Sequence, residues 1–448
     1  KGIYQASVFI NNIDMNTEMT DKERLDYKGQ ARFVRAYYYW LLLRRYGPVP
    51  IVPNEGIDYT QSYEQIAIPR NSYEEVVDYI SNEMIQAAKE IQYTKRDGEN
   101  CARPTKGACL ATRALALIYS ASPLANGNND TYAKSLVDDK GKELLNSTYK
   151  EEKWAKAAAA CRDVMELGVY DLYHASFNTT EAVGDPKTIV PADSTCIFAQ
   201  NTWPKGWKNI DPFKSYRVLF SGDIAPEDNT ELIFSRIDQN ATEINHSMKS
   251  FARHSMPRDF GGWNTHGLTQ KMVDAYYMND GSDCPGKDRE LNGGNGTERL
   301  TGFTTLQDYQ QGKYKPLAAN VSLQYANREP RFYASVGYNG SVWEYLSDPE
   351  PTHHNRQTFY YRGSGNGYNN SQFYLRTGIS VKKYVNQTDV PDREDYRNIK
   401  DKAEPAIRYA DILLLYAEAL NELEGTYSIA SWDKNTTDRK STRLNSSH

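Results

Sequence analysis

The chain of 448 residues is poor in cysteine, has no excess of basic side chains and contains no long apolar run. Its five cysteines lack CxxC spacing, so the sequence predicts neither a disulfide framework nor a zinc site. A formal net charge of −5 argues against a nucleic-acid-binding protein that relies on bulk charge. Because a membrane-spanning helix needs about 18 or more consecutive apolar residues, the sequence predicts no such helix.

Short motifs that identify common enzyme classes are also missing. The sequence contains no GxSxG nucleophile elbow, no HExxH zinc motif and no phosphate-binding Walker loop. A pair of carboxylates for glycoside hydrolysis has no sequence signature, because its geometry depends on the fold. A glycoside hydrolase of the α/α type therefore stays open as an alternative.

Apolar residues at helical spacing dominate the first third of the chain. They predict four helices: Asp21–Tyr46, Tyr73–Tyr93, Pro104–Ser122 and Glu151–Leu167. A further helix is predicted at Pro405–Gly425, which has one broad apolar face and a proline suited to its first turn. These helices predict a stack of helix–turn–helix pairs, although the sequence shows no clean repeat period.

Residues 173–404 differ in character, because they are rich in Gly, Asn, Pro, Trp and Tyr. One helix is predicted there, at Thr269–Tyr277. Short strand-like runs are Glu231–Ile237, Phe332–Val336, Thr358–Tyr361 and Val381–Val385. Loops on a rigid scaffold commonly carry binding residues, so we expect the functional site in this region.

Blocks of the sequence resemble, in the same order, blocks of SusD/RagB-like proteins. They include GQARFVRAYYYWLLLRRYGPVPIV at Gly29–Val52, RPTKGACLATRALALIYSASP at Arg103–Pro123, LTQKMVDAYYMNDG at Leu268–Gly281 and RYADILLLYAEALNE at Arg408–Glu422. The resemblance implies a mainly α fold, a right-handed tetratricopeptide-like helical superhelix with an irregular, loop-rich lobe that contains short strands. We expect a scaffold at residues 1–172, a ligand-binding lobe at 173–404, a closing scaffold helix at 405–425 and a tail at 426–448.

The same resemblance implies a surface-exposed lipoprotein of the outer membrane of Bacteroidota that is not an enzyme. Such a protein captures oligosaccharides and delivers them to a SusC-like TonB-dependent transporter. It binds no nucleic acid, and it contacts the membrane only through a lipid anchor. A RagB-like member that captures peptides is the nearest alternative, and a protein-binding scaffold is a further one.

Both ends of the chain depart from the family pattern. Family members begin with a signal peptide and an acylated cysteine, which this sequence lacks, so we expect truncation at the start. The final STRLNSSH, Ser441–His448, is typical of a cloning remnant and is expected to be non-native. We therefore expect exposed apolar surface on the helix at Pro405–Gly425 and no well-packed native element after Gly425.

Tryptophans in polar loops are the main candidates for ligand contact, because flat aromatic rings stack on the apolar faces of sugars. Trp263 lies in RDFGGWNTH among polar groups that can take up hydroxyls, and NTWPKGWKN contains two more tryptophans. A packing role competes with ligand contact for each of these tryptophans. The predicted ligand-binding residues are Trp203, Trp207, Arg258, Asp259, Trp263, Asn264, His266, Trp343, Tyr361 and Arg362.

Two weaker patterns predict no cofactor. The GxGxG at Gly363–Gly367 is followed by a strand-like run, which favours a hairpin tip over a nucleotide-binding loop. The adjacent pair His353-His354 is poorly placed to chelate one ion, and the acidic run around Asp280 and Asp283 lacks calcium-loop spacing. We predict no cofactor and no metal at the site, and leave a structural calcium ion open.

Overall fold

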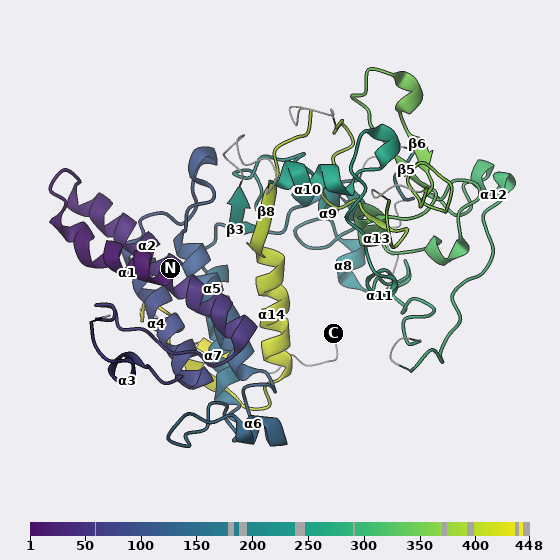
Figure 1. Cartoon of the computed structure of the whole chain (residues 1–448). Helices are drawn as coiled ribbons and strands as arrows, with labels where there is room; N and C mark the ends of the chain where they lie inside the picture. The colour runs from purple at the N-terminus through teal and green to yellow at the C-terminus, as the bar shows by residue number, and fades with distance from the viewer. Residues whose placement is uncertain are drawn as a thin grey trace. The chain divides into compact units, whose positions relative to one another are not determined.

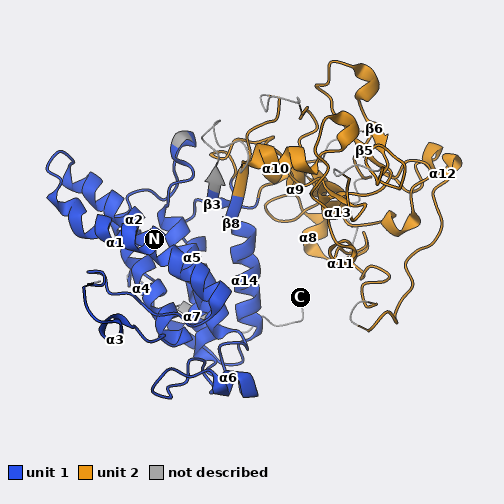
Figure 2. Cartoon of the chain, viewed as in Figure 1, with its two compact units in different colours: residues 1–172, 230–236, 405–448 blue, residues 173–229, 237–404 orange. Residues whose placement is uncertain are grey.

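A computed structural model of the chain describes residues 1–58, 60–177, 183–187, 195–237, 247–289, 292–369, 374–391, 398–434 and 439–441. The fold is mainly helical, with 40% helix and 9% strand, which confirms the predicted fold class (Figure 1). The chain divides into two compact units (Figure 2). Unit 1 comprises Lys1–Leu172, Thr230–Arg236 and Pro405–His448; unit 2 comprises Tyr173–Asn229 and Ile237–Glu404.

Unit 1 is a succession of helices in which α1, α2, α4, α5, α7 and α14 each contact the next. The helices are α1 (Gly2–Asn12), α2 (Asp21–Tyr46), α3 (Tyr63–Ile66), α4 (Tyr73–Glu90), α5 (Lys106–Ala121), α6 (Thr131–Ser135), α7 (Glu152–Met165) and α14 (Tyr409–Asn421), with 3-10 turns at Ile13–Met15 and Gly98–Asn100. The four helices predicted in the first third are confirmed as α2, α4, α5 and α7, to within a few residues at their ends.

Capping residues explain where the two longest helices begin. At α2 the Thr20 hydroxyl accepts a hydrogen bond from the backbone N–H of Glu23, whose carboxylate accepts one from the Thr20 N–H. Ser72 and Glu75 make the same reciprocal pair at the start of α4. Each pair satisfies backbone donors that have no partner within the helix, so the sequence fixes these starts locally.

One continuous apolar cluster fills unit 1. Trp40 on α2 and Trp154 on α7 are both buried in it, as their helical positions predict. The facing helices α5 and α7 contribute mainly alanines to the cluster, among them Ala114 and Ala158, both fully buried. Small side chains at these positions let the helix backbones approach closely, so packing in this unit follows from the sequence pattern.

The helix predicted at Pro405–Gly425 is shorter than expected, because its first residues form a strand. Strand β8 (Ala403–Arg408) pairs with β3 (Leu232–Ile237), and α14 begins only at Tyr409. The Tyr409 N–H donates to the Glu231 carbonyl at 2.7 Å, and the Arg408 guanidinium contacts the Glu231 carboxylate at 3.0 Å. Pairing with a strand distant in sequence therefore overrides the helical pattern at this end.

The apolar face of α14 is partly exposed, as expected. The expectation that no well-packed element follows Gly425 is wrong, because the chain after Gly425 is packed. Leu414 is 70% exposed. Strand β9 (Tyr427–Ile429) nevertheless pairs with β10 (Arg439–Ser441), and Trp432 packs against the apolar cluster. The Tyr427 hydroxyl also donates to the Glu151 carboxylate at 2.9 Å. Residues 442–448 of the predicted non-native tail lie outside the described residues.

Unit 2 consists of short elements joined by long loops. Its helices are α8 (Ile197–Gln200), α9 (Pro212–Ser221), α10 (Met248–Ser255), α11 (Gln270–Asp274), α12 (Leu306–Gln310) and α13 (Pro330–Ser335), with 3-10 turns at Arg258–Phe260, Leu323–Tyr325 and Pro351–His353. Its strands are β1 (Ala175–Ser176), β2 (Ile210–Asp211), β4 (Val336–Gly337), β5 (Ser341–Trp343), β6 (Arg356–Thr358) and β7 (Ser380–Val381). They form three antiparallel pairs: β1 with β2, β4 with β7 and β5 with β6.

The helix predicted at Thr269–Tyr277 is confirmed as α11, whereas three of the predicted strands in this region are wrong or too long. Phe332–Val336 is mostly helix α13, because Pro330 at its first position and Glu329 before it start a helical turn. Only Val336 continues as strand. The predicted strands Thr358–Tyr361 and Val381–Val385 overlap the observed β6 and β7 by one residue each.

Two smaller apolar clusters form the core of unit 2, and buried polar side chains fix its loops through hydrogen bonds. One cluster surrounds Phe332 and the other surrounds Trp343. Arg328, 2% exposed, donates hydrogen bonds to the backbone carbonyls of Val273 at 2.6 Å and Tyr276 at 2.8 Å. Such side-chain donors satisfy carbonyl groups that no helix or sheet ladder pairs.

Candidate functional site

A cavity of about 770 Å³ lies in unit 2, beside the loop that follows α10. It is lined by Arg253, Arg258, Asp259, Gly261, Gly262, Trp263, Pro349, Val390, Pro391 and Asn398. Three of the predicted ligand-binding residues, Arg258, Asp259 and Trp263, are therefore together on one wall. A tryptophan beside a cation and a carboxylate gives this wall both an apolar surface and polar groups that bind hydroxyls.

The orientation of the Trp263 side chain is fixed by its contacts with Arg253 and His254. The backbone N–H of Trp263 donates to the Arg253 carbonyl at 2.9 Å, and the Arg253 guanidinium lies 5.1 Å from the centre of the indole ring. The His254 ring meets the indole edge-on, with 4.5 Å between ring centres. The indole nevertheless stays 38% exposed. Packing on Arg253 and His254 thus holds a flat apolar surface toward solvent with little side-chain entropy left to lose on binding.

Asn264, predicted to contact ligand, instead supports the loop. It is fully buried and has a φ of 52°, a left-handed conformation that asparagine adopts more readily than most residues. Its side-chain N–H donates to the carbonyl of Asn366 at 2.6 Å. The prediction is corrected for this residue, because a buried side chain committed to Asn366 is not available to a ligand.

Asn366 joins the two loops that carry most of the predicted site. Its side chain donates to the Asp259 carboxylate at 2.8 Å and accepts a hydrogen bond from the Asp259 backbone N–H at 3.1 Å. Gly365 lies against Asp259 so closely that a Cβ there would collide with the carboxylate. Gly365 and Gly367 thus serve close backbone packing, and among the described residues no helix follows this loop directly.

Tyr361 and Arg362 belong to the same loop as Asn366. Tyr361 is 58% exposed, and its ring lies 5.3 Å from the Phe359 ring. The Arg362 guanidinium lies over the Tyr368 ring at 5.7 Å. Neither Tyr361 nor Arg362 is among the residues that line the cavity, but Asn366 ties their loop to Asp259 on its wall.

His266 and His254 form an aromatic stack behind Trp263. Their rings lie 5.1 Å apart, and the ring of Phe251 lies 4.4 Å from that of His266. Burial lowers the pKa of both histidines, and the nearby His266 and Arg253 lower the pKa of His254 further. Both imidazoles are therefore neutral at pH 7. His266, predicted to contact ligand, lies half-buried in this stack and does not line the cavity.

The remaining predicted tryptophans have other surroundings. Trp343, 1% exposed, belongs to an apolar cluster with Tyr345, so its predicted ligand contact is corrected to a core position. Trp203 is half-buried against His174, with 5.0 Å between ring centres. Trp207 is 38% exposed and stacks on Phe198 at 6.2 Å. Neither Trp203 nor Trp207 lines the cavity beside Trp263.

Several residues of the cavity escaped sequence reasoning. Arg253 lies on the helical face of α10, where it looks like an ordinary surface arginine, yet it is 3% exposed. Pro349, Pro391 and Asn398 come from loops distant in sequence and have no motif around them. Asn366 carried a usable signal, because an asparagine between two glycines is typical of a tightly packed loop.

No metal centre is found in the part of the chain that the structure describes: no three His, Cys, Asp or Glu side chains there are placed to hold an ion. Asp280 accepts hydrogen bonds from the N–H and hydroxyl of Ser282, and Asp283 pairs with Lys287. All five cysteines are free thiols.

Comparison with family models matches two parts of the chain. Residues 230–435 match the model described as the SusD family. Residues 1–119 match a second model, described as starch-binding and associating with the outer membrane. A comparison with curated proteins finds no match.

Solved structures with the same fold include two from Bacteroides fragilis. One, a SusD-like protein, has a TM-score of 0.60 and 20% identity, and the match covers 94% of this chain and 62% of that one. The other, a SusD-like carbohydrate-binding protein, has a TM-score of 0.56 and 17% identity, with 99% of this chain and 65% of that one covered. This chain thus spans somewhat less than two thirds of the length of each.

The chain therefore shares its fold with these SusD-like proteins. The chain belongs to the SusD family, whose models together match most of its length. In the described part of the chain, no helix combines the length and the apolar character needed to cross a bilayer.

Proposed function

We propose that this protein captures oligosaccharides in the cavity beside Trp263. The observation that carries the proposal is the exposed indole, held by Arg253 and His254 and flanked by Arg258 and Asp259. A sugar ring presents an apolar C–H face to the indole, while its hydroxyls bind the neighbouring guanidinium and carboxylate. Membership of the SusD family supports a carbohydrate ligand.

The lining of the cavity favours binding without cleavage. Among its described residues Asp259 is the single carboxylate, whereas most glycoside hydrolases use two. Asp259 is also held by Asn366, which suits a fixed hydrogen-bond acceptor. We therefore propose that the protein is not an enzyme, and that its affinity is modest because an open site buries little of its ligand.

We further propose that the captured oligosaccharide passes to a SusC-like TonB-dependent transporter, and that a lipid anchor holds the whole protein on the cell surface. The association of one matching family model with the outer membrane supports this location. Co-expression with the transporter, followed by affinity purification of either component, tests the partnership. Recovery of each component alone would contradict it.

Calorimetric titration of the protein with a panel of neutral oligosaccharides tests the ligand class. We expect Trp263→Ala to weaken binding about tenfold, because one aromatic stacking surface is lost. Phe303→Ala is the matched control, since Phe303 is an aromatic side chain of unit 2, is 65% exposed and does not line the cavity. Unchanged affinity in Trp263→Ala would remove this residue from the site.

The same panel decides between the alternatives. Product formation during the titration would identify a glycoside hydrolase and contradict binding alone. Heat with peptides but with no oligosaccharide would identify a RagB-like, peptide-capturing protein. Trp207→Ala and Tyr361→Ala, at two exposed aromatic positions, show whether a longer oligosaccharide reaches beyond the cavity.

A further inference from the structure

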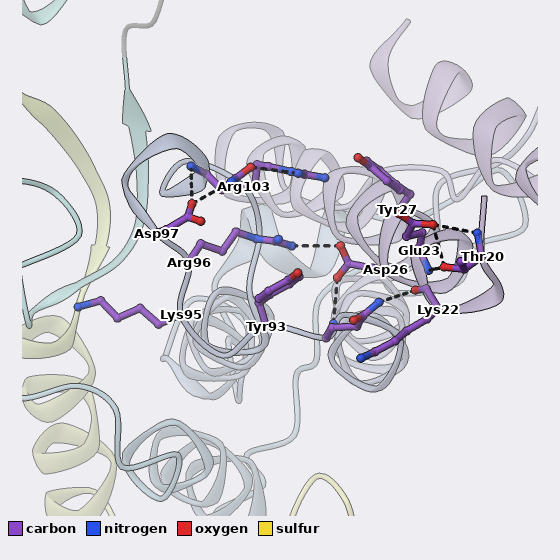
Figure 3. A pocket seen from close by; sticks show the side chains of 12 residues that line it. Thr20, Lys22, Glu23, Asp26, Tyr27, Tyr93, Lys95, Arg96, Asp97 and Arg103 are labelled. Atoms are coloured by element: carbon purple, nitrogen blue, oxygen red, sulfur yellow. Dashed lines mark hydrogen bonds and ion pairs between the residues drawn. The ribbon is translucent and has the colours of Figure 1, made fainter. Parts of the chain in front are cut away.

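A second cavity, of about 510 Å³, lies in unit 1. It is formed by the start of α2 and by the segment that links α4 to α5 (Figure 3). Its lining residues are Thr20, Lys22, Glu23, Asp26, Tyr27, Gln92, Tyr93, Lys95, Arg96, Asp97, Asn100 and Arg103. The lining thus contains four cationic and three anionic side chains. Which charges are free to bind a ligand depends on the hydrogen bonds and ion pairs that each side chain already makes.

The three carboxylates are committed to the local structure. Glu23 accepts from the Thr20 N–H at 2.8 Å in the cap of α2. Asp97 accepts from the side chain of Asn100 at 2.8 Å, and buried Asp26 accepts from the Gln92 N–H at 2.9 Å. Each carboxylate thus fixes a backbone turn or helix end, and among the described residues Asp26 alone of the three also forms an ion pair with a lining cation, Arg96 at 3.5 Å.

Two arginines meet in this cavity, each stacked on a tyrosine. The Arg96 guanidinium lies 4.5 Å from the centre of the Tyr93 ring, and the Arg103 guanidinium lies 4.9 Å from that of Tyr27. Arg96 also contacts Asp26 at 3.5 Å, toward which Figure 3 shows it extended. Stacking fixes the guanidinium planes, so their N–H groups keep one direction.

Hydrogen-bond donors remain on both arginines. The Nε of Arg96 donates to the Pro104 carbonyl at 3.0 Å, and Arg103 donates to Gln30 at 3.0 Å and to Asn100 at 3.1 Å. Each guanidinium keeps one terminal nitrogen without an acceptor among the described residues. Burial lowers the pKa of Arg96, the charge of Asp26 opposes this shift, and the charge of Arg103 adds to it, as expected for two neighbouring cations.

Lys22 and Lys95 add two more cations at the rim. Among the residues that the structure describes, no carboxylate lies within ion-pairing distance of either ammonium group. Figure 3 shows Lys95 extended away from the Tyr93 ring, whereas Arg96 lies beside it. The inner part of the cavity is therefore defined by the two stacked arginines, and an anion placed between them would relieve their repulsion.

We propose that this cavity binds an oxyanion, the carboxylate or phosphate group of a small ligand, through Arg96 and Arg103. Guanidinium groups bind both kinds of oxyanion through paired N–H donors, and a fixed guanidinium plane loses little entropy when it does so. The site lies in unit 1 and shares no residue with the cavity beside Trp263. It is therefore independent of the proposed capture of neutral oligosaccharides.

Calorimetric titration of the intact chain with three probes tests the proposal: inorganic phosphate, galacturonate and neutral galactose. We expect phosphate or galacturonate to bind and to raise the thermal midpoint, with galactose giving no effect that depends on this cavity. Binding of phosphate alone identifies a phosphate site, and binding of galacturonate alone identifies a carboxylate site. Absence of binding by both anions would overturn the proposal.

Variants locate the binding. Arg103→Gln is expected to weaken anion binding about tenfold, the loss of one charge-assisted hydrogen-bond pair. Arg45→Gln is the control, since Arg45 is an exposed arginine on the last turn of the same helix α2. Lys22→Gln, at an exposed rim position, gives a second measurement that does not disturb packing, with an expected loss of about threefold.

The result overturns the proposal if Arg103→Gln folds and keeps full affinity, or if Arg45→Gln loses as much affinity as Arg103→Gln. If Arg103→Gln does not fold, unchanged affinity in Lys22→Gln overturns the proposal instead. Trp263→Ala is expected to leave anion binding unchanged. Failure of oligosaccharide binding at Trp263 and failure of anion binding at Arg103 are thereby separate outcomes.

Discussion

Units 1 and 2 satisfy their backbone polar groups in different ways. In unit 1 the long helices pair their own N–H and C=O groups, and one apolar cluster packs them together. In unit 2 short elements leave many such groups in loops, and buried polar side chains pair with them. Arg328 donates to two carbonyls at the C-terminal end of α11, and the Lys402 ammonium contacts the Asp389 carboxylate at 2.8 Å with both side chains fully buried.

This difference explains why the candidate ligand site lies in unit 2. A helix face presents side chains at fixed spacing but little free backbone, whereas a loop held by side chains brings distant residues together. Asp259 and Asn366 are an example, since they are 107 residues apart and hydrogen-bonded. The loop-rich unit therefore depends on single polar contacts, while the helical unit depends on summed apolar burial.

The strongest test of this comparison is Asp389→Asn in unit 2. It leaves the Lys402 ammonium buried without a counter-charge, so we expect a loss of about 3–5 kcal/mol in the free energy of unfolding. Urea denaturation followed by tryptophan fluorescence measures the loss. Asp401→Asn is the matched control, because Asp401 is exposed and pairs with Lys249 at 2.9 Å in the same unit. We expect the control to change stability by less than about 1 kcal/mol, and equal effects would contradict the role of burial.

A leucine pair tests the corresponding dependence of unit 1 on apolar burial. Leu43→Ala on α2 removes a side chain that is 1% exposed, and we expect it to cost about 3 kcal/mol. Leu414→Ala on α14 makes the same chemical change at a position that is 70% exposed, with an expected effect within about 0.5 kcal/mol. Chemical denaturation of both variants gives the comparison. Similar values for the two would show that burial in the apolar cluster does not set the stability of this unit.

Asn366→Ala sharpens the comparison at the site itself. It removes two hydrogen bonds to Asp259, one of them to the carboxylate, and we expect a stability loss of about 1–3 kcal/mol. Because Asp259 then loses its fixed position, we also expect weaker oligosaccharide binding in calorimetric titration. Asn295→Ala, an exposed asparagine in another loop of unit 2, is the control. Full affinity in Asn366→Ala would show that Asp259 does not need this support.

The smallest expected effect is a pH dependence carried by His254 and His266. Burial holds the pKa of both below the ordinary value of 6.5, so the unfolded chain takes up protons that the folded chain does not. The contribution of the two neutral imidazoles to the free energy of unfolding should therefore be complete above pH 6.5. It should fall as the pH decreases from 6.5 to the lowered pKa values of the folded state. Thermal unfolding between pH 7.5 and about 5, above the range of most carboxylates, measures this fall. The double variant His254→Gln/His266→Gln should flatten it, and an unchanged profile would assign the effect to other groups.

Much of unit 1 was predictable from the sequence. Capping boxes at Thr20 and Ser72 and a 3.6-residue apolar period define its helices, since both signals depend on residues a few positions apart. The first residues of the last predicted helix were not predictable. Ala403–Arg408 forms a strand because a partner at Leu232–Ile237, far away in the sequence, pairs with it.

The candidate site was predicted only in part, for the same reason. Its polar loop around Trp263 is a local signal, and Arg258, Asp259 and Trp263 do line one cavity. Burial is not a local property, so the sequence alone could not distinguish the exposed Trp263 from Trp343, which lies in the core at 1% exposure. The sequence prediction placed Asn264 and His266 in the site because they lie next to Trp263 in the chain. In the tertiary structure Asn264 is hydrogen-bonded to Asn366 and His266 stacks on His254, so both support the loop.

The sequence by itself determined the helices of unit 1, the loop character of unit 2 and the resemblance to the SusD family, because periodicity, caps and ordered sequence blocks are local patterns. Tertiary structure alone decided which loop residues face the cavity and which are buried. It also decided that Arg96 and Arg103 meet over two tyrosines, since stacking and charge proximity depend on how the chain folds back on itself.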